Sequence, residues 1–121
     1  MNSKKTVIIG ATTNPSRYAY MAANRLVENG HEIIPIGIKK GELAGQEIIN
    51  DKPPLDDVGT VTLYLGPAKQ PEYYDYIISL NPKRVIFNPG TENQEFESAL
   101  RKENIEAIEA CTLVMLSANT Y

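Results

Sequence analysis

The feature that most constrains the fold is a short β-branched run that passes within a few residues into the start of a helix. Val7-Ile8-Ile9 is typical of a strand buried on both faces of a parallel sheet. Gly10 permits a sharp turn and the close approach of a ligand. Asn14 and Pro15 are typical of an N-cap and a first helical turn. A strand leading directly into a helix presents free backbone N–H groups and the positive end of the helix dipole, which suits a phosphate.

Arg17 follows in the predicted first turn of that helix. A cation there is unfavourable for the helix dipole, but a guanidinium can hold a phosphate through two hydrogen bonds. An ordinary strand–turn–helix connection with a solvated arginine explains the segment equally well, so both interpretations stay open. The dinucleotide fingerprint G-x-G-x-x-G is absent because the turn has only one glycine, and the chain has no G-x-x-x-x-G-K-[ST] pattern.

Strand-like and helix-like stretches alternate along the rest of the chain. Segment 46–59 looks irregular, with at most a short strand near Ile48-Ile49, and 111–117 fits either a short helix or a strand. This alternation predicts an α/β fold, a single domain over 1–121 with a parallel sheet covered by helices on both faces. We expect helices over 16–29, 71–80 and 93–102, and strands over 31–36, 60–65, 84–87 and, at an edge, 105–108.

Small or polar residues follow four of the predicted strands, and parallel strands end at the same edge of a sheet, where ligands bind. Lys39 and Lys40 lie where an NAD-binding fold usually has an acidic residue, so they favour a phosphorylated ribose, as in coenzyme A or NADP. A solvated charged loop is the common alternative. The converging turns are Gly10–Asn14, which includes Thr13, Gly37–Gly41, Gly66-Pro67 and Asn88–Thr91.

Composition narrows the classes of partner. A net charge of −3 and a pI near 5.2 argue against general nucleic-acid binding, since no excess of Lys and Arg neutralises a phosphate backbone. Cys111 is a single cysteine, which excludes an intrachain disulfide and fits a reducing compartment. No apolar run approaches the roughly 18 residues of a membrane span. We therefore expect a cytoplasmic protein that binds neither membranes nor nucleic acids.

The sequence resembles the small CoA-binding proteins that are similar to the N-terminal domain of the succinyl-CoA synthetase α subunit. The resemblance covers nearly the whole chain and implies a Rossmann-like three-layer fold whose five-stranded parallel sheet binds coenzyme A through the first loop and helix. The matching segments are Val7–Arg17 (the family's V-V-G-A-S…P…R), Ala19-Tyr20, Asn29-Gly30-His31 with Ile34-Pro35-Ile36 (compare G-Y-x-V-x-P-V), Leu43–Ile49, Gly90 and Cys111.

Site residues follow from the resemblance position by position. It implies that phosphates are held by Gly10, Ala11, Thr12 and Arg17, that Ile36 and Lys39 flank the adenosine end, and that Asn88, Pro89 and Gly90 border the pantetheine path. The chain departs from the family pattern at Gly37-Ile38, Gly66-Pro67 and 88–90, which indicates a divergent member.

Three functions fit these observations. The first is non-catalytic binding of coenzyme A or an acyl-CoA, the second is NADP binding, and the third is a ligand-free module that docks to a protein partner. Leu113–Leu116 is a candidate apolar patch for docking, although core packing explains it too. The sole histidine, His31, lies at the end of its strand away from the expected ligand, and no Tyr-x-x-x-Lys spacing occurs. We predict a binder rather than an enzyme, with no catalytic residue and no metal.

Overall fold

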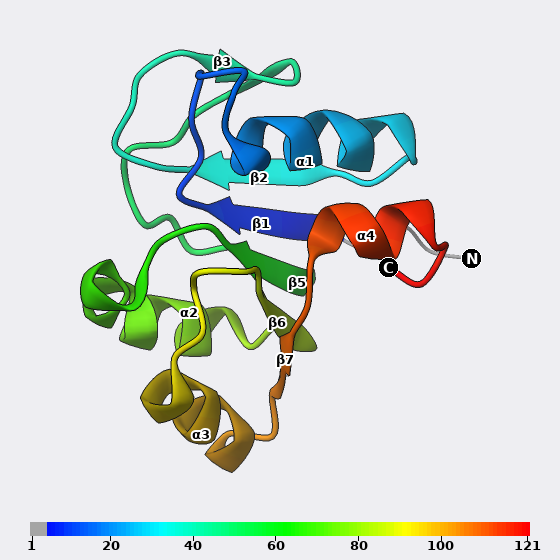
Figure 1. The fold of residues 1–121 in the computed structure, drawn as a ribbon. Helices are drawn as coiled ribbons and strands as arrows, with labels where there is room; N and C mark the ends of the chain where they lie inside the picture. The colour runs from blue at the N-terminus through cyan, green and yellow to red at the C-terminus, as the bar shows by residue number, and fades with distance from the viewer. Residues whose placement is uncertain (1–4) are drawn as a thin grey trace.

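A five-stranded parallel sheet in the order β2-β1-β5-β6-β7 forms the centre of the computed structural model, which describes residues 5–121 (Figure 1). Its strands are β1 (Lys5–Ile9), β2 (Ile33–Ile36), β5 (Val58–Leu63), β6 (Arg84–Phe87) and β7 (Glu106–Glu109), and a separate hairpin pairs β3 (Glu42–Leu43) with β4 (Gln46–Glu47). The helices are α1 (Tyr18–Glu28), α2 (Tyr74–Leu80), α3 (Gln94–Lys102) and α4 (Thr112–Ser117), with short 3₁₀ turns η1 (Pro67–Lys69) and η2 (Pro71–Tyr73).

The two faces of the sheet bury different side chains because alternate residues of a strand point to opposite sides. Val7 and Ile9 of β1 pack in one cluster with residues of α2 and α3, whereas Ile8 packs with α1 and α4. Figure 1 shows these two helix pairs on opposite sides of the sheet. The predicted three-layer architecture with five parallel strands is therefore confirmed.

The chain reverses its direction of winding at β1, since β2 lies on one side of β1 and β5 on the other. Ligands of open α/β sheets bind at such a switch point, outside the carboxyl ends of the strands. The loops that follow β1 and β5 therefore lie where a ligand is expected.

Several element boundaries differ from the sequence prediction. The sequence prediction does not include the β3–β4 hairpin, whose second strand begins the segment expected to be irregular. The predicted strand near Ile49 is an isolated parallel bridge to Ile36. The predicted helix over 71–80 begins as the 3₁₀ turn η2, and the ambiguous C-terminal segment forms the helix α4. The fifth strand is at an edge, as predicted.

A buried polar network joins β5, β6 and α4. Asn88, which follows β6, donates from Nδ2 to Oγ1 of Thr62 at 2.6 Å and to the Leu63 carbonyl at 2.8 Å. Its Oδ1 accepts from the backbone N–H of Thr112 at 2.9 Å, and the Thr62 and Thr112 hydroxyls lie 2.9 Å apart. This network holds the start of α4 on the sheet. Within residues 5–121, no helix is long and apolar enough to cross a membrane.

Candidate functional site

The first loop is fixed between two neighbouring strands. Gly10 and Ala11 both donate backbone N–H bonds to the Ile36 carbonyl at 3.0 Å, so these two donors are used within the protein. Gly10 has φ +93°, and a Cβ there would lie 3.1 Å from the backbone carbonyl of Tyr64. The missing side chain at Gly10 thus makes room for the end of β5, which is a structural reason for glycine that the sequence prediction did not include.

Asn14 does not cap α1, which corrects the sequence prediction. Its Oδ1 accepts from the backbone N–H and the hydroxyl of Ser16, at 3.0 and 2.8 Å, so the carboxamide is used within the loop. The helix begins at Tyr18 instead, and its N-cap is Arg17, which makes no side-chain capping bond.

Four backbone donors beside this turn remain available. The N–H groups of Thr12, Thr13, Tyr18 and Ala19 donate to no acceptor among the described residues, and all four residues line the same cleft. Tyr18 and Ala19 form the start of α1, where the helix dipole is positive; Tyr18 is exposed and Ala19 is buried. The loop and the helix start are therefore suited to an anion.

Gly37 directly follows β2 and packs against the first loop at Ala11. A Cβ at Gly37 would lie only 2.5 Å from the Ala11 carbonyl oxygen. Beyond it, Asn50 donates from Nδ2 to the carbonyls of Gly37 and Lys39, at 2.7 and 2.8 Å. The backbone that carries Lys39 is thus held in place beside the first loop.

We expect Gly37→Ala to lower the free energy of unfolding by about 1–3 kcal/mol, because the methyl group forces the backbone of the first loop to move. Chemical denaturation measures the change. Gly66→Ala is the matched control, since Gly66 also lines the cleft and has a φ of −64°, and a Cβ at Gly66 would meet no atom within 4 Å. Equal stability of the two variants would contradict this prediction.

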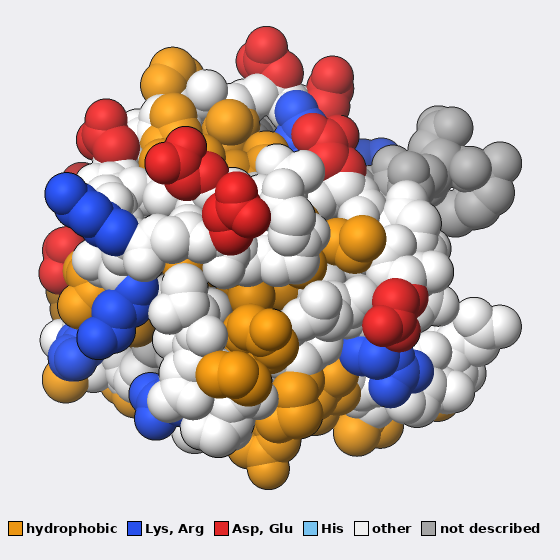
Figure 2. Space-filling view, turned by 90° about the horizontal axis from the view of Figure 1, so that it is seen from above, with side chains coloured by type: hydrophobic (Ala, Val, Ile, Leu, Met, Phe, Trp, Pro, Cys, Tyr) orange, Lys and Arg blue, Asp and Glu red, His pale blue; other side chains and the backbone are white. Residues whose placement is uncertain are grey.

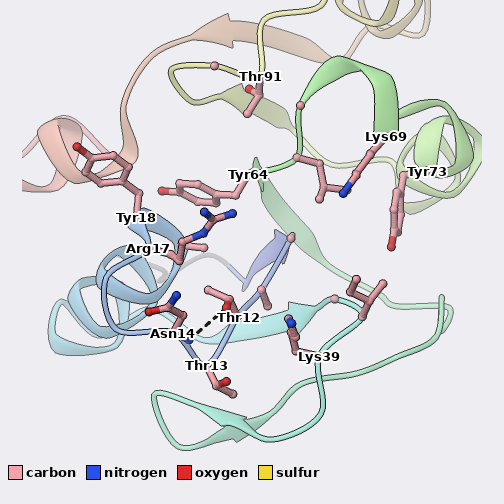
Figure 3. A pocket seen from close by; sticks show the side chains of 18 of the residues that line it. Thr12, Thr13, Asn14, Arg17, Tyr18, Lys39, Tyr64, Lys69, Tyr73 and Thr91 are labelled. Carbon is pink, nitrogen blue, oxygen red and sulfur yellow. Dashed lines mark hydrogen bonds between the residues drawn. The ribbon is translucent and has the colours of Figure 1, made fainter.

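The loops that follow β1, β2, β5 and β6 enclose a cleft of about 810 Å³, within the usual range for small-molecule sites. Arg17, Lys39 and Lys69 line it, and their side chains form no ion pair with any described residue. Figure 3 shows Arg17 beside Tyr64 on one side and the two lysines on the other. Figure 2 shows basic side chains gathered on the side toward which β1 and β2 point in Figure 1.

The charge of the cleft is opposite to that of the whole protein. Its lining has three basic side chains and one carboxylate, Glu72, which also lies 4.0 Å from Lys52. The protein as a whole has a net charge of −3. Field lines concentrate in a cleft with low-dielectric walls, so this arrangement favours an anionic ligand.

Apolar groups also line the cleft. Tyr64 and Leu65 follow β5, and Tyr73 ends η2. Ile38, which follows β2, is 84% exposed. Burial raises the pKa of Tyr64 to about 12, so its phenol stays neutral at physiological pH. The cleft therefore offers both cations and apolar surface.

The structure brings most of the predicted site residues together. Ile36 and Asn88 are the exceptions, since they are 1% and 2% exposed, belong to the core and do not line the cleft. Sequence reasoning missed Lys69, Tyr64 and Tyr73, although Lys69 follows a turn that was expected at the site. The predicted residues that line the cleft are Gly10, Ala11, Thr12, Thr13, Arg17, Gly37, Lys39, Gly66, Pro89 and Gly90.

The C-terminal residues singled out from the sequence lie elsewhere. Cys111 is partly exposed and does not line the cleft. In α4, Leu116 is buried in the core while Val114 is 62% exposed. The apolar segment is thus divided between core and surface.

A parallel sheet with an anion-suited cleft at its switch point defines a Rossmann-like binding domain. Residues 4–117 match the model of the family described as CoA binding domain, and the chain belongs to this family. No curated protein matches the chain.

Solved structures share the fold. One described as a crystal structure of an uncharacterized protein is 57% identical, covers 100% of both chains and has a TM-score of 0.97. Cell-free ID.343 from Thermus thermophilus is 24% identical over 98% of this chain and 91% of its own, with a TM-score of 0.83. A dinucleotide forming acetyl-coenzyme A synthetase 1 from Ca. Korarchaeum cryptofilum, in complex with phosphate and ADP, is 17% identical, with a TM-score of 0.71, over 92% of this chain and 26% of its own.

Proposed function

We propose that this protein binds coenzyme A or an acyl-CoA in the cleft without catalysing a reaction on it. The observation that carries the proposal is a set of three basic side chains, Arg17, Lys39 and Lys69, in a cleft of an acidic protein. None of the three forms an ion pair with a residue that the structure describes. Coenzyme A carries a pyrophosphate and a 3′-phosphate, so it presents two separate anionic groups. Membership of the CoA binding domain family supports the same ligand.

Each anionic group has a suitable partner in the cleft. Arg17 and the free N–H groups of Thr12 and Thr13 suit the pyrophosphate, because they combine a bidentate cation with backbone donors. Lys39 and Lys69, on the other side, suit the 3′-phosphate. The pantetheine arm would then follow the lining formed by Pro89 and Gly90.

The side chains of the cleft support binding rather than catalysis. Of the described residues that line it, Glu72 alone carries a carboxylate, and none is a histidine or a cysteine. General acid–base or nucleophilic catalysis usually needs a pair of such groups within hydrogen-bond reach of each other. Acetyl-CoA incubated with the protein is therefore expected to release no thiol beyond the uncatalysed rate.

Calorimetric titration with coenzyme A, dephospho-CoA, NADP and NAD tests the proposal. We expect coenzyme A to bind about tenfold or more tightly than dephospho-CoA, because a charge-assisted hydrogen bond to a phosphate contributes roughly 1.5–3 kcal/mol. If NADP binds more tightly than coenzyme A, NADP becomes the proposed ligand, because it also carries a phosphorylated ribose that suits the lysines. No heat with any of the four ligands would contradict the proposal and favour a module that acts through a protein partner.

A further inference from the structure

One buried side chain, Gln70, connects the loops that follow β5 and β6. These two loops, residues 64–73 and 89–93, form what we call the far wall of the cleft. Gln70 lies between η1 and η2 and is only 1% exposed. Its Nε2 donates to the Leu65 carbonyl at 2.9 Å and to the Thr91 carbonyl at 2.8 Å. Leu65 follows β5 and Thr91 follows β6, and both line the cleft. The amide therefore bridges two loops that the sheet itself leaves unconnected.

The network extends from Gln70 to the start of α3. Its Oε1 accepts from Nδ2 of Asn93 at 2.9 Å, and the same nitrogen donates to the Tyr74 hydroxyl at 2.7 Å. Asn93 is the N-cap of α3, where its Oδ1 accepts from the backbone N–H of Phe96 at 3.1 Å. Both hydrogens and the oxygen of the Gln70 amide are thus used, which rigidifies a buried network.

Lys69 directly precedes Gln70 in the chain and lines the cleft. Its side chain forms no ion pair among residues 5–121, so its backbone places it over the cleft. That backbone belongs to short turns in which Lys69 donates to the Gly66 carbonyl at 3.0 Å and Tyr73 to the Gln70 carbonyl at 2.8 Å. Tyr73 also lines the cleft. The anchored residue therefore has a cleft-lining residue on either side of it.

We propose that Gln70 is a positioning residue, which holds Lys69 and the far wall at a fixed separation from Arg17 and so sets the affinity for a phosphate-bearing ligand. This inference rests on the proposed function. A carboxamide is required because only it donates two hydrogen bonds and accepts one from the same planar group. A carboxylate at the same position donates none.

Two measurements on the full chain test the role of Gln70 as an anchor between the two loops: backbone amide exchange without ligand, and the affinity for coenzyme A. The variants are Gln70→Met and Gln70→Glu, with Gln46→Met as the matched control because Gln46 is exposed on β4. Backbone amide exchange at 64–73 and 89–93 should accelerate in both Gln70 variants while exchange in β1 stays unchanged. Coenzyme A should bind about fivefold or more weakly to them, by the cost of ordering a loosened wall.

A double-mutant cycle separates positioning from a general loss of stability. Lys69→Ala should weaken coenzyme A binding severalfold in the natural background and less than about twofold in the Gln70→Met background, because the lysine is already misplaced there. Additive effects would overturn the inference. If Gln70→Met does not fold, Gln70→Asn replaces it in the cycle, since its shorter amide cannot bridge both carbonyls.

The outcomes distinguish this inference from the proposed function. Faster exchange in the two loops with unchanged coenzyme A affinity would overturn the positioning role and leave coenzyme A binding intact. Unchanged exchange would overturn the anchor itself. A natural protein that does not bind coenzyme A would overturn the proposed function and the ligand half of this inference, and amide exchange would still decide whether Gln70 joins the loops.

Discussion

Replacing Asn88 by alanine is expected to lower the free energy of unfolding by about 2–4 kcal/mol, because it leaves buried partners without hydrogen bonds. The variant loses two bonds donated from Nδ2, to the Thr62 hydroxyl and the Leu63 carbonyl, and one accepted by Oδ1 from the Thr112 N–H. Each partner lies inside the protein, where water does not replace the amide. Coenzyme A affinity of the folded variant should stay unchanged, since Asn88 does not line the cleft.

Urea denaturation and calorimetric titration of the same preparations measure both effects. Asn29→Ala is the matched control: Nδ2 of Asn29 also donates to a carbonyl, that of Arg25 at 2.7 Å, but Asn29 is exposed. Its stability should change by no more than about 0.5 kcal/mol. A loss of affinity in Asn88→Ala without a loss of stability would mean that Asn88 contacts the ligand, as the family resemblance implies.

The strands could be predicted from the sequence because their burial leaves a local pattern. Strands covered on both faces are continuous apolar runs, and Val7-Ile8-Ile9 and Val85-Ile86-Phe87 show this directly. Once the alternation with helices is recognised, the parallel topology limits where the strand ends can lie. The position of the cleft could therefore be predicted from the order of the elements.

The start of α1 could not be predicted because the same residue has two local uses. Asparagine before proline suits an N-cap, but it also forms a tight turn with a nearby hydroxyl. The Ser16 N–H and hydroxyl both donate to Asn14, and the helix begins after Arg17. Nothing in the local sequence decides between these conformations.

The role of Gln70 in the far wall of the cleft escaped prediction because it depends on contacts between distant segments. Gln70 looks like an ordinary polar residue beside a proline, and only its bonds to Leu65 and Thr91 make it a structural centre. Ile36 and Asn88 are predicted site residues that the structure places outside the cleft lining. Both occupy strand ends that face the ligand side in the resemblance, yet their side chains pack inward.

Arg17→Ala is expected to weaken coenzyme A binding by at least about tenfold, since a bidentate charge-assisted contact to phosphate contributes roughly 1.5–3 kcal/mol. Arg17 lines the cleft at the start of α1, and its side chain forms no ion pair within the described part of the chain. Removing it therefore breaks no ion pair among these residues. The free energy of unfolding should change by no more than about 0.5 kcal/mol.

Arg25→Ala is the matched control for this experiment, because it removes the same charge from the other end of α1. Arg25 lies 3.7 Å from Glu28 and does not line the cleft. Both substitutions change the net charge by one unit, so any long-range effect of charge on affinity is shared. A difference between the two variants that persists at high salt would locate the contact at Arg17, because close contacts are screened less than distant charges. Equal affinities of the two variants for coenzyme A would contradict a contact between Arg17 and phosphate and would leave only the backbone donors of the first loop.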